Sequence, residues 1–313
     1  MIYMYLLIGL IVFLFLSRTD ALGQESERIY VRSFDGAYIN SVLRIPADKG
    51  PHPAILFIHG GVGGATQNTG PPDYVQGHFL ADGYVVFEVD YRCYHFGDEE
   101  LEDVVACYRY LRSRLEVDSS RVGVIGGSHG GYLALMLATR EKPSAMTIFA
   151  GLVDIEGVFY DQARQLSAES YGNFELLEKR YHQGLSIREE SDLMTKGKIG
   201  PPSRKLGPGA GVKDVASRWG ENVDTYRRYS PMSQCPLIEC PVLFVVGSED
   251  EFKVAGKALI DQLQSLDRVA EYLELSDVGH AFYWGHRPDT NGNIPESFYL
   301  SLKRTTDFMK SWV

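Results

Sequence analysis

Apolar and polar positions alternate along the chain in patterns that are typical first of strands and then of helices. Residues 28–34 and 37–45 alternate with a period of two around Asp35-Gly36, a strong turn dipeptide, and this predicts a β-hairpin. Short apolar runs further along the chain predict buried strands. These runs are 54–61, 84–92, 121–127, 145–151, 240–247 and 270–275.

Apolar residues at helical spacing predict helices between and after these strands. The predicted helices are 101–115, 130–140, 254–266 and 296–312. Strands that alternate with helices indicate an α/β fold with a mostly parallel sheet covered on both faces. Ligands of such sheets bind beyond the carboxyl ends of the strands, so we expect the chemistry in the residues just after each strand.

The pattern is interrupted between about residues 152 and 229, where no clear strand is visible. This stretch contains a glycine- and proline-rich run, residues 197–211, and we interpret it as a cap or lid inserted into the sheet order. Residues 196–213 carry lysine and arginine but no acidic residue. They form either a solvated surface loop or a lid that favours anionic substrates or surfaces.

The chain begins with an apolar run, Met1 to Leu16, that carries no charge. The run is shorter than the roughly 20 residues that a membrane-spanning helix needs. It fits the hydrophobic region of a secretory signal, and Ala21-Leu22-Gly23 predicts cleavage before Gln24. We therefore expect residues 1–23 to be a signal peptide and the protein to be secreted or periplasmic. The alternative is an uncleaved N-terminal anchor, which would be the only membrane contact.

Composition narrows the classes of partner. The 313 residues carry a formal net charge of -10, which argues against nucleic acid because phosphate binding needs a basic face. The cysteines lack the CxxC or histidine spacing of a metal site. In an exported protein they are either disulfide-bonded, with a local bridge between positions 235 and 240 as one option, or free thiols. They are Cys93, Cys107, Cys235 and Cys240.

The strongest chemical motif is the GxSxG pattern of residues 126–130. It lies directly after a predicted strand and opens a predicted helix. A nucleophilic serine must be exposed on a sharp strand-to-helix turn, and small flanking residues permit the strained backbone and the close packing of that turn. We therefore predict that Ser128 is a catalytic nucleophile.

A serine nucleophile needs a base, and the base needs a group that orients it. Asp250 follows the strand predicted at 240–247, and His280 follows the strand predicted at 270–275. Both lie where the site is expected, and the order serine, acid, histidine is that of a hydrolase built on such a sheet. We assign His280 as general base and Asp250 as its orienting acid. Rival acids nearby in the sequence are Glu249, Glu251 and Asp277.

The reaction also needs donors for an oxyanion. The backbone N–H of His129, next to the nucleophile, is the first candidate. The second is the N–H of Gly61 in the turn after the first apolar strand, with Gly60 or Val62 as alternatives, and His59 supports that turn. The glycine-rich stretches lack the residues of a phosphate-binding loop or a dinucleotide fold, and no HExxH motif occurs, so we expect no cofactor and no metal.

From about Arg28 to Val313 the chain resembles an α/β-hydrolase of the prolyl-oligopeptidase-like branch. The resemblance rests on Ser33 to Gly36, His59 to Gly61, Asp90 to Arg92, Gly126 to Leu135, Tyr229 to Pro231, Gly247 to Asp250 and Val278 to Phe282. It implies an α/β-hydrolase domain over residues 24–313, with the cap at about 152–229, that cleaves ester or peptide bonds through an acyl-enzyme. Residues 90–111 also resemble esterases of the hormone-sensitive lipase type, whose third loop glycine is Val62 here.

We predict a carboxylesterase that acts on small or medium esters. The family's oligopeptidases carry a large N-terminal propeller for which this chain has no room, and the insertion is long, so peptidase activity is the second choice. An exopeptidase would need an anchor for a peptide terminus, such as the acidic pair Glu189-Glu190. A non-catalytic binding protein on a hydrolase fold is the third choice, and the complete triad argues against it.

Overall fold

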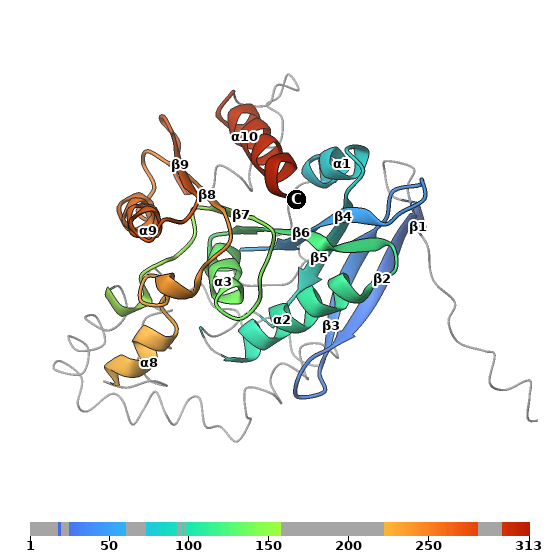
Figure 1. The fold of residues 1–313 in the computed structure, drawn as a ribbon, viewed down its shortest axis with the longest axis horizontal. Coiled ribbons are helices and arrows are strands. Elements are labelled where there is room, and N and C mark those ends of the chain that lie inside the picture. The colour runs from blue at the N-terminus through green and yellow to red at the C-terminus, as the bar shows by residue number, and fades with distance from the viewer. Residues whose placement is uncertain are drawn as a thin grey trace, which may run out of the picture.

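A nine-stranded sheet with the order β1-β2-β3-β5-β4-β6-β7-β8-β9 runs through the described residues (Figure 1). The computed structural model describes residues 18–19, 25–60, 73–92, 96, 98–157, 222–280 and 296–313. The first four strands in spatial order pair antiparallel, and the pairs from β5 to β9 are parallel. The strands are β1 (Arg18–Thr19), β2 (Glu25–Arg32), β3 (Tyr38–Arg44), β4 (His52–Ile58), β5 (Val85–Asp90), β6 (Val117–Gly127), β7 (Met146–Phe149), β8 (Val242–Gly247) and β9 (Ala270–Leu275).

Helices cover both faces of the sheet (Figure 1). On one face lie α1 (Asp73–Ala81) and α10 (Glu296–Trp312), and on the other lie α2 (Asp98–Ser113), α3 (His129–Ala138) and α9 (Lys253–Ser265). Two glycines of β6 lie on opposite faces of the sheet. Gly123 faces Met309 of α10, and Gly126 faces the start of α3. The connection between β7 and β8 ends with α8 (Val223–Arg228) and a short 3-10 helix, Cys235–Leu237.

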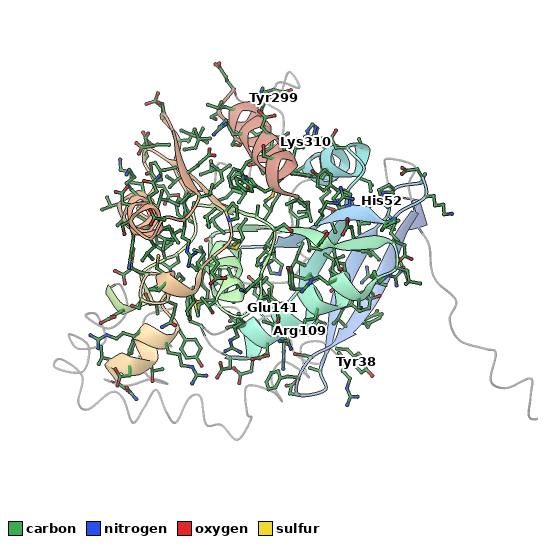
Figure 2. The ribbon with its side chains drawn as sticks, in the orientation of Figure 1. Tyr38, His52, Arg109, Glu141, Tyr299 and Lys310 are labelled. Atoms are coloured by element: carbon green, nitrogen blue, oxygen red, sulfur yellow. The ribbon has the colours of Figure 1, made fainter. Side chains whose placement is uncertain are left out.

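The core is one continuous cluster on both sides of the parallel strands. In β4, residues 54–58 are all at most 2% exposed, as expected for a strand covered on both faces. By contrast, Tyr38 on the hairpin is 62% exposed and projects outward (Figure 2). The predicted α/β architecture, with a mostly parallel sheet between two helical layers, is therefore confirmed.

The N-terminal hairpin is tied to the rest of the molecule by a half-buried arginine. Arg92, just after β5, donates to Asp35 in the hairpin turn at 2.7 Å and to Asp103 of α2 at 2.6 Å. Ser33 adds a hydrogen bond to the same Asp103 carboxylate. Charged groups that are shielded from water need such partners. Here the ion pairs of Arg92 join the hairpin turn, the end of β5 and α2.

The observed elements follow the sequence predictions with a few differences. Each predicted strand and helix has a counterpart, but β6 begins at Val117, earlier than the apolar run, and α1 was not predicted. Of the interpreted cap, residues 158–221 lie outside the described residues, as do residues 1–17 and Cys93. The part of the chain that is described contains no helix long and apolar enough to cross a membrane.

The described cysteines are buried free thiols, so they form no disulfide with one another. Burial raises the pKa of Cys235 to about 11 and that of Cys240 to about 12. They are therefore protonated and unreactive near neutral pH. Of the two options that the sequence left open, the free thiols apply to Cys107, Cys235 and Cys240.

Candidate active site

The predicted nucleophile lies on a sharp turn between β6 and α3. β6 ends at Gly127, α3 begins at His129, and Ser128 between them has φ 52° and ψ -118°. A positive φ is strained for a residue with a side chain and is held by the packing around it. A Cβ atom at Gly126 would lie 2.3 Å from the Gly130 oxygen, and one at Gly130 would lie 2.2 Å from the Ile58 oxygen. Both outer positions of the GxSxG motif therefore require glycine.

Three predicted residues meet in a continuous chain of hydrogen bonds. Ser128 Oγ lies 2.9 Å from His280 Nε2, and His280 Nδ1 lies 3.0 Å from Asp250 Oδ2. A carboxylate only accepts hydrogen bonds, so Nδ1 carries the proton that is donated to Asp250. In the neutral imidazole, Nε2 then has a free lone pair for the serine hydroxyl proton.

The acid and the base come together because they follow neighbouring parallel strands. β8 and β9 pair in parallel, so Asp250 and His280 emerge at the same edge of the sheet. Asp250 is only 3% exposed, and its second oxygen accepts the N–H of Phe252 at 2.8 Å. The Phe252 ring also packs edge-on against the His280 imidazole, with centroids 5.0 Å apart. The carboxylate thus has a fixed orientation, whereas the His280 side chain is 37% exposed and open to a substrate.

The rival acids lie elsewhere. Asp277 is exposed, and its backbone N–H donates to Ser248 Oγ at 2.9 Å. Glu249 and Glu251, on either side of Asp250, are also exposed. The carboxylate that accepts the hydrogen bond from His280 is that of Asp250.

The structure describes one of the two predicted oxyanion donors. His129 is the first residue of α3, so its N–H has no acceptor within the helix and lies at the positive end of the helix dipole. Gly61 and its alternative Val62 lie outside the described residues, so the second donor stays a prediction.

His59, which precedes this turn, has a structural environment. It is fully buried and stacks on Tyr91 with ring centroids 4.4 Å apart. Burial lowers its pKa from 6.5 to about 4, so it is neutral at pH 7. The Tyr91 hydroxyl donates to the His59 carbonyl at 2.8 Å, which fixes the backbone leading into the predicted oxyanion turn.

Sequence reasoning missed one residue that contacts this site. Glu100, in the first turn of α2, lies 2.5 Å from Nε2 of His129 and is 1% exposed. An acidic residue at a helix start is normally taken as solvated and favourable to the helix dipole. Only the tertiary contact between α2 and α3 shows that this carboxylate is buried beside the nucleophile.

A solved structure identifies the fold. Carboxyl esterase 2 from the mycorrhizal fungus Tuber melanosporum aligns with 92% of this chain and 87% of its own, with a TM-score of 0.62 and 17% identity. The chain has the α/β-hydrolase fold. This confirms the predicted fold class, and at 17% identity the likeness concerns the fold alone.

Sequence comparisons add relatives of this chain. The BD-FAE family model matches residues 42–188. Human dipeptidyl peptidase 8 is 33% identical over 149 residues, which are 41% of this chain and 17% of the human protein. Esterase EstD of Thermotoga maritima is 25% identical over 290 residues, 87% of this chain and 64% of that protein. The chain thus spans less than a fifth of the human relative, and the relatives' names support a hydrolase without separating esterase from peptidase.

Proposed function

We propose that the chain is a serine hydrolase that cleaves carboxylic esters of small or medium size through an acyl-enzyme. The observation that carries the proposal is the chain of hydrogen bonds from Ser128 through His280 to Asp250 at the carboxyl ends of parallel strands. A similarity to an esterase over most of the chain supports the choice of ester.

The mechanism follows from the hydrogen bonds. Ser128 Oγ attacks the ester carbonyl while Nε2 of His280 takes its proton. The buried Asp250 carboxylate stabilises the imidazolium that forms. His280 then gives the proton to the departing alkoxide, which leaves as the alcohol. In the second half, His280 takes a proton from water as the resulting hydroxide attacks the acyl carbonyl. The bond to Ser128 Oγ then breaks, His280 returns the proton to Ser128, and the acid leaves.

Negative charge on the substrate oxygen is stabilised by backbone donors. The N–H at the start of α3, that of His129, lies next to the attacking atom and needs no rearrangement during the reaction. The turn after β4 supplies the second donor, for which Gly61 is our candidate. Loss of one such donor typically lowers kcat by about 100- to 1,000-fold.

A peptidase is the second candidate, because human dipeptidyl peptidase 8 has the higher identity to this chain over a shorter stretch. The same triad would cleave an amide, but His280 must then protonate an amine before the bond breaks. Such an enzyme also needs an anchor for the peptide terminus, and Glu189-Glu190, our candidate, lies outside the described residues.

A matched rate comparison tests the proposal. An acyl series of nitrophenyl esters is assayed against aminoacyl nitroanilides, with Ser128→Ala as the blank. We expect fast ester turnover, negligible anilide cleavage and loss of nearly all turnover in the blank. Selective anilide cleavage would favour the peptidase, and full activity of Ser128→Ala would contradict the nucleophile itself.

We also propose that residues 1–23 direct export; cleavage would remove the two-residue edge strand β1 and keep the other eight strands. The proposal is supported by the uncharged run Met1 to Leu16 and the small residues before Gln24. Expression of the full chain followed by fractionation and N-terminal sequencing tests it. A mature protein that begins at Gln24 is expected, whereas an intact N-terminus in the membrane fraction would indicate an anchor.

A further inference from the structure

The contact between Glu100 and His129 involves the residue that directly follows the nucleophile. The two side chains approach to 2.5 Å, and the carboxylate belongs to α2 while the imidazole belongs to the first residue of α3. A carboxylate that is 1% exposed needs strong hydrogen bonds to offset the loss of water. This contact is therefore a strong restraint on the His129 side chain.

Aromatic rings hold the same imidazole from several sides. The Phe96 ring lies edge-on at 4.6 Å, Tyr132 is tilted at 5.5 Å, and Tyr91 is stacked at 6.0 Å, all measured between centroids. Tyr91 also donates to the His59 carbonyl, so it contacts both the turn after β4 and the start of α3. The imidazole thus has one orientation, set by the rings and by the carboxylate at its Nε2.

The backbone of His129 has little freedom to shift without affecting the reaction. Its neighbour Gly130 touches the carbonyl oxygens of Ile58 and His59 so closely that no Cβ fits there. Its own N–H is the proposed oxyanion donor. Displacement of a positioned group by about 1 Å costs about 100-fold in rate.

We propose that Glu100 is a positioning residue, which holds the His129 imidazole and through it the backbone N–H that stabilises the oxyanion. The inference rests on the proposed serine hydrolase function. In the proposed mechanism Glu100 acts through His129, whose imidazole it contacts. Its removal lowers kcat and leaves KM nearly unchanged.

Two substitutions of Glu100 separate geometry from charge. Glu100→Ala removes the acceptor, and we expect kcat per active site to fall about 10- to 100-fold with KM within about threefold. Glu100→Gln keeps an acceptor oxygen of the same reach without the charge, and we expect kcat within about threefold of the parent. Active sites are counted with a fluorophosphonate that labels the nucleophile, so unfolded protein does not enter kcat.

Asp103→Asn is the matched control. Asp103 is a buried carboxylate on the same helix, but its partners are Arg92 and Ser33 at the hairpin. This variant is expected to lose stability in thermal unfolding and to keep the parent kcat per labelled site. A fall in kcat equal to that of Glu100→Ala would show a general effect of damage to α2 and would overturn the proposal.

A double-mutant cycle completes the test. If Glu100 acts through His129, then Glu100→Ala in a His129→Ala background lowers kcat no further, whereas additive losses would overturn the proposal. An unchanged kcat in Glu100→Ala, or equal losses in Glu100→Ala and Glu100→Gln, would also overturn it. If the phosphonate labels no parent enzyme, the proposed function fails instead, so the two failures are distinct.

Discussion

At the scale of single residues, the candidate site depends on which atoms carry protons. The Asp250 carboxylate accepts hydrogen bonds from the Phe252 N–H and from Nδ1 of His280. It therefore favours the His280 tautomer that carries its proton on Nδ1. That tautomer leaves Nε2 of His280 free to accept the proton of Ser128. A substitution that conserves shape but alters this proton count is therefore more informative than a truncation.

Asp250→Asn is such a substitution. The new amide N–H₂ can donate to Nδ1, which favours the tautomer that carries its proton on Nε2 and cannot act as base. We expect kcat per labelled active site to fall about 10,000-fold, with thermal unfolding close to that of the parent. Glu249→Gln, one position before on the same loop and exposed, is the control and keeps full activity. Equal activity of Asp250→Asn and the parent in the nitrophenyl ester assay would contradict the assignment.

His59 makes stability depend on pH. Burial lowers its folded-state pKa to about 4 from the 6.5 of an unperturbed histidine, so the unfolded chain binds the proton more readily. The stabilisation is complete above pH 6.5 and is lost as the pH falls toward 4, by roughly 3 kcal/mol in total. Urea unfolding between pH 7 and pH 4 measures this slope. We expect His59→Gln to show a smaller pH dependence than the parent, and parallel curves would refute the assignment.

At the scale of elements, the packing of α3 against β4 sets the geometry of the nucleophile turn. A Cβ at Gly130 would lie 2.2 Å from the Ile58 oxygen and 2.3 Å from the His59 oxygen, both of them backbone atoms held in or beside β4. Backbone atoms of a strand cannot move individually, so a side chain at this position would have to shift the start of α3. That shift would displace both Ser128 and the proposed oxyanion donor.

Gly130→Ala tests this packing. We expect kcat per labelled site to fall by about 100-fold or more, because the nucleophile and the donor move together. Ala134→Gly, a buried position further along α3, adds no atom and is the control. It is expected to lower the free energy of unfolding by about 1 kcal/mol and to leave kcat unchanged. Comparable kcat values for both variants would contradict the steric argument.

The triad residues could be predicted from the sequence because strand ends are visible in it. Short apolar runs locate the strands, and parallel pairing brings their carboxyl ends to one edge, where Ser128, Asp250 and His280 meet. Their hydrogen bonds could not be derived from spacing, since 122 residues separate the serine from the acid. Pairing of the strands, which the sequence does not display, supplies that proximity.

Several features that the sequence analysis missed involve polar residues without a clear apolar pattern. Helix α1 buries Gln76, which accepts from Arg44 and donates to Glu88, so its core-facing side mixes this polar residue with the apolar Phe79 and Leu80. After Val117, the early part of β6 consists of polar residues 118–120, of which Ser119 and Ser120 are exposed, and an apolar pattern cannot mark them as strand. Glu100 belongs to the same class, because its burial depends on a partner from another helix.

At the scale of the whole molecule, the core joins parts of the chain that are far apart in sequence. The last helix, α10, contacts β7, β8 and β9, and Met309 packs on Gly123 in the middle of β6. The nucleophile turn lies at the end of β6. Helix α3 packs on the side of β6 opposite to α10. The fold thus separates Met309, which packs on the middle of β6, from the residues that we propose for catalysis, which lie beyond the ends of the strands.

Met309→Ala tests that separation. Met309 is fully buried, so its truncation is expected to lower the free energy of unfolding by about 2–5 kcal/mol, measured by urea denaturation. Leu300→Ala on the same helix is the control, because Leu300 is 45% exposed and its loss costs little. At 25 °C both variants are expected to keep the parent kcat per labelled active site, since neither side chain contacts the triad. A large fall in kcat for Met309→Ala with unchanged stability would mean that the α10 face controls the site directly, and that the two roles are not separated.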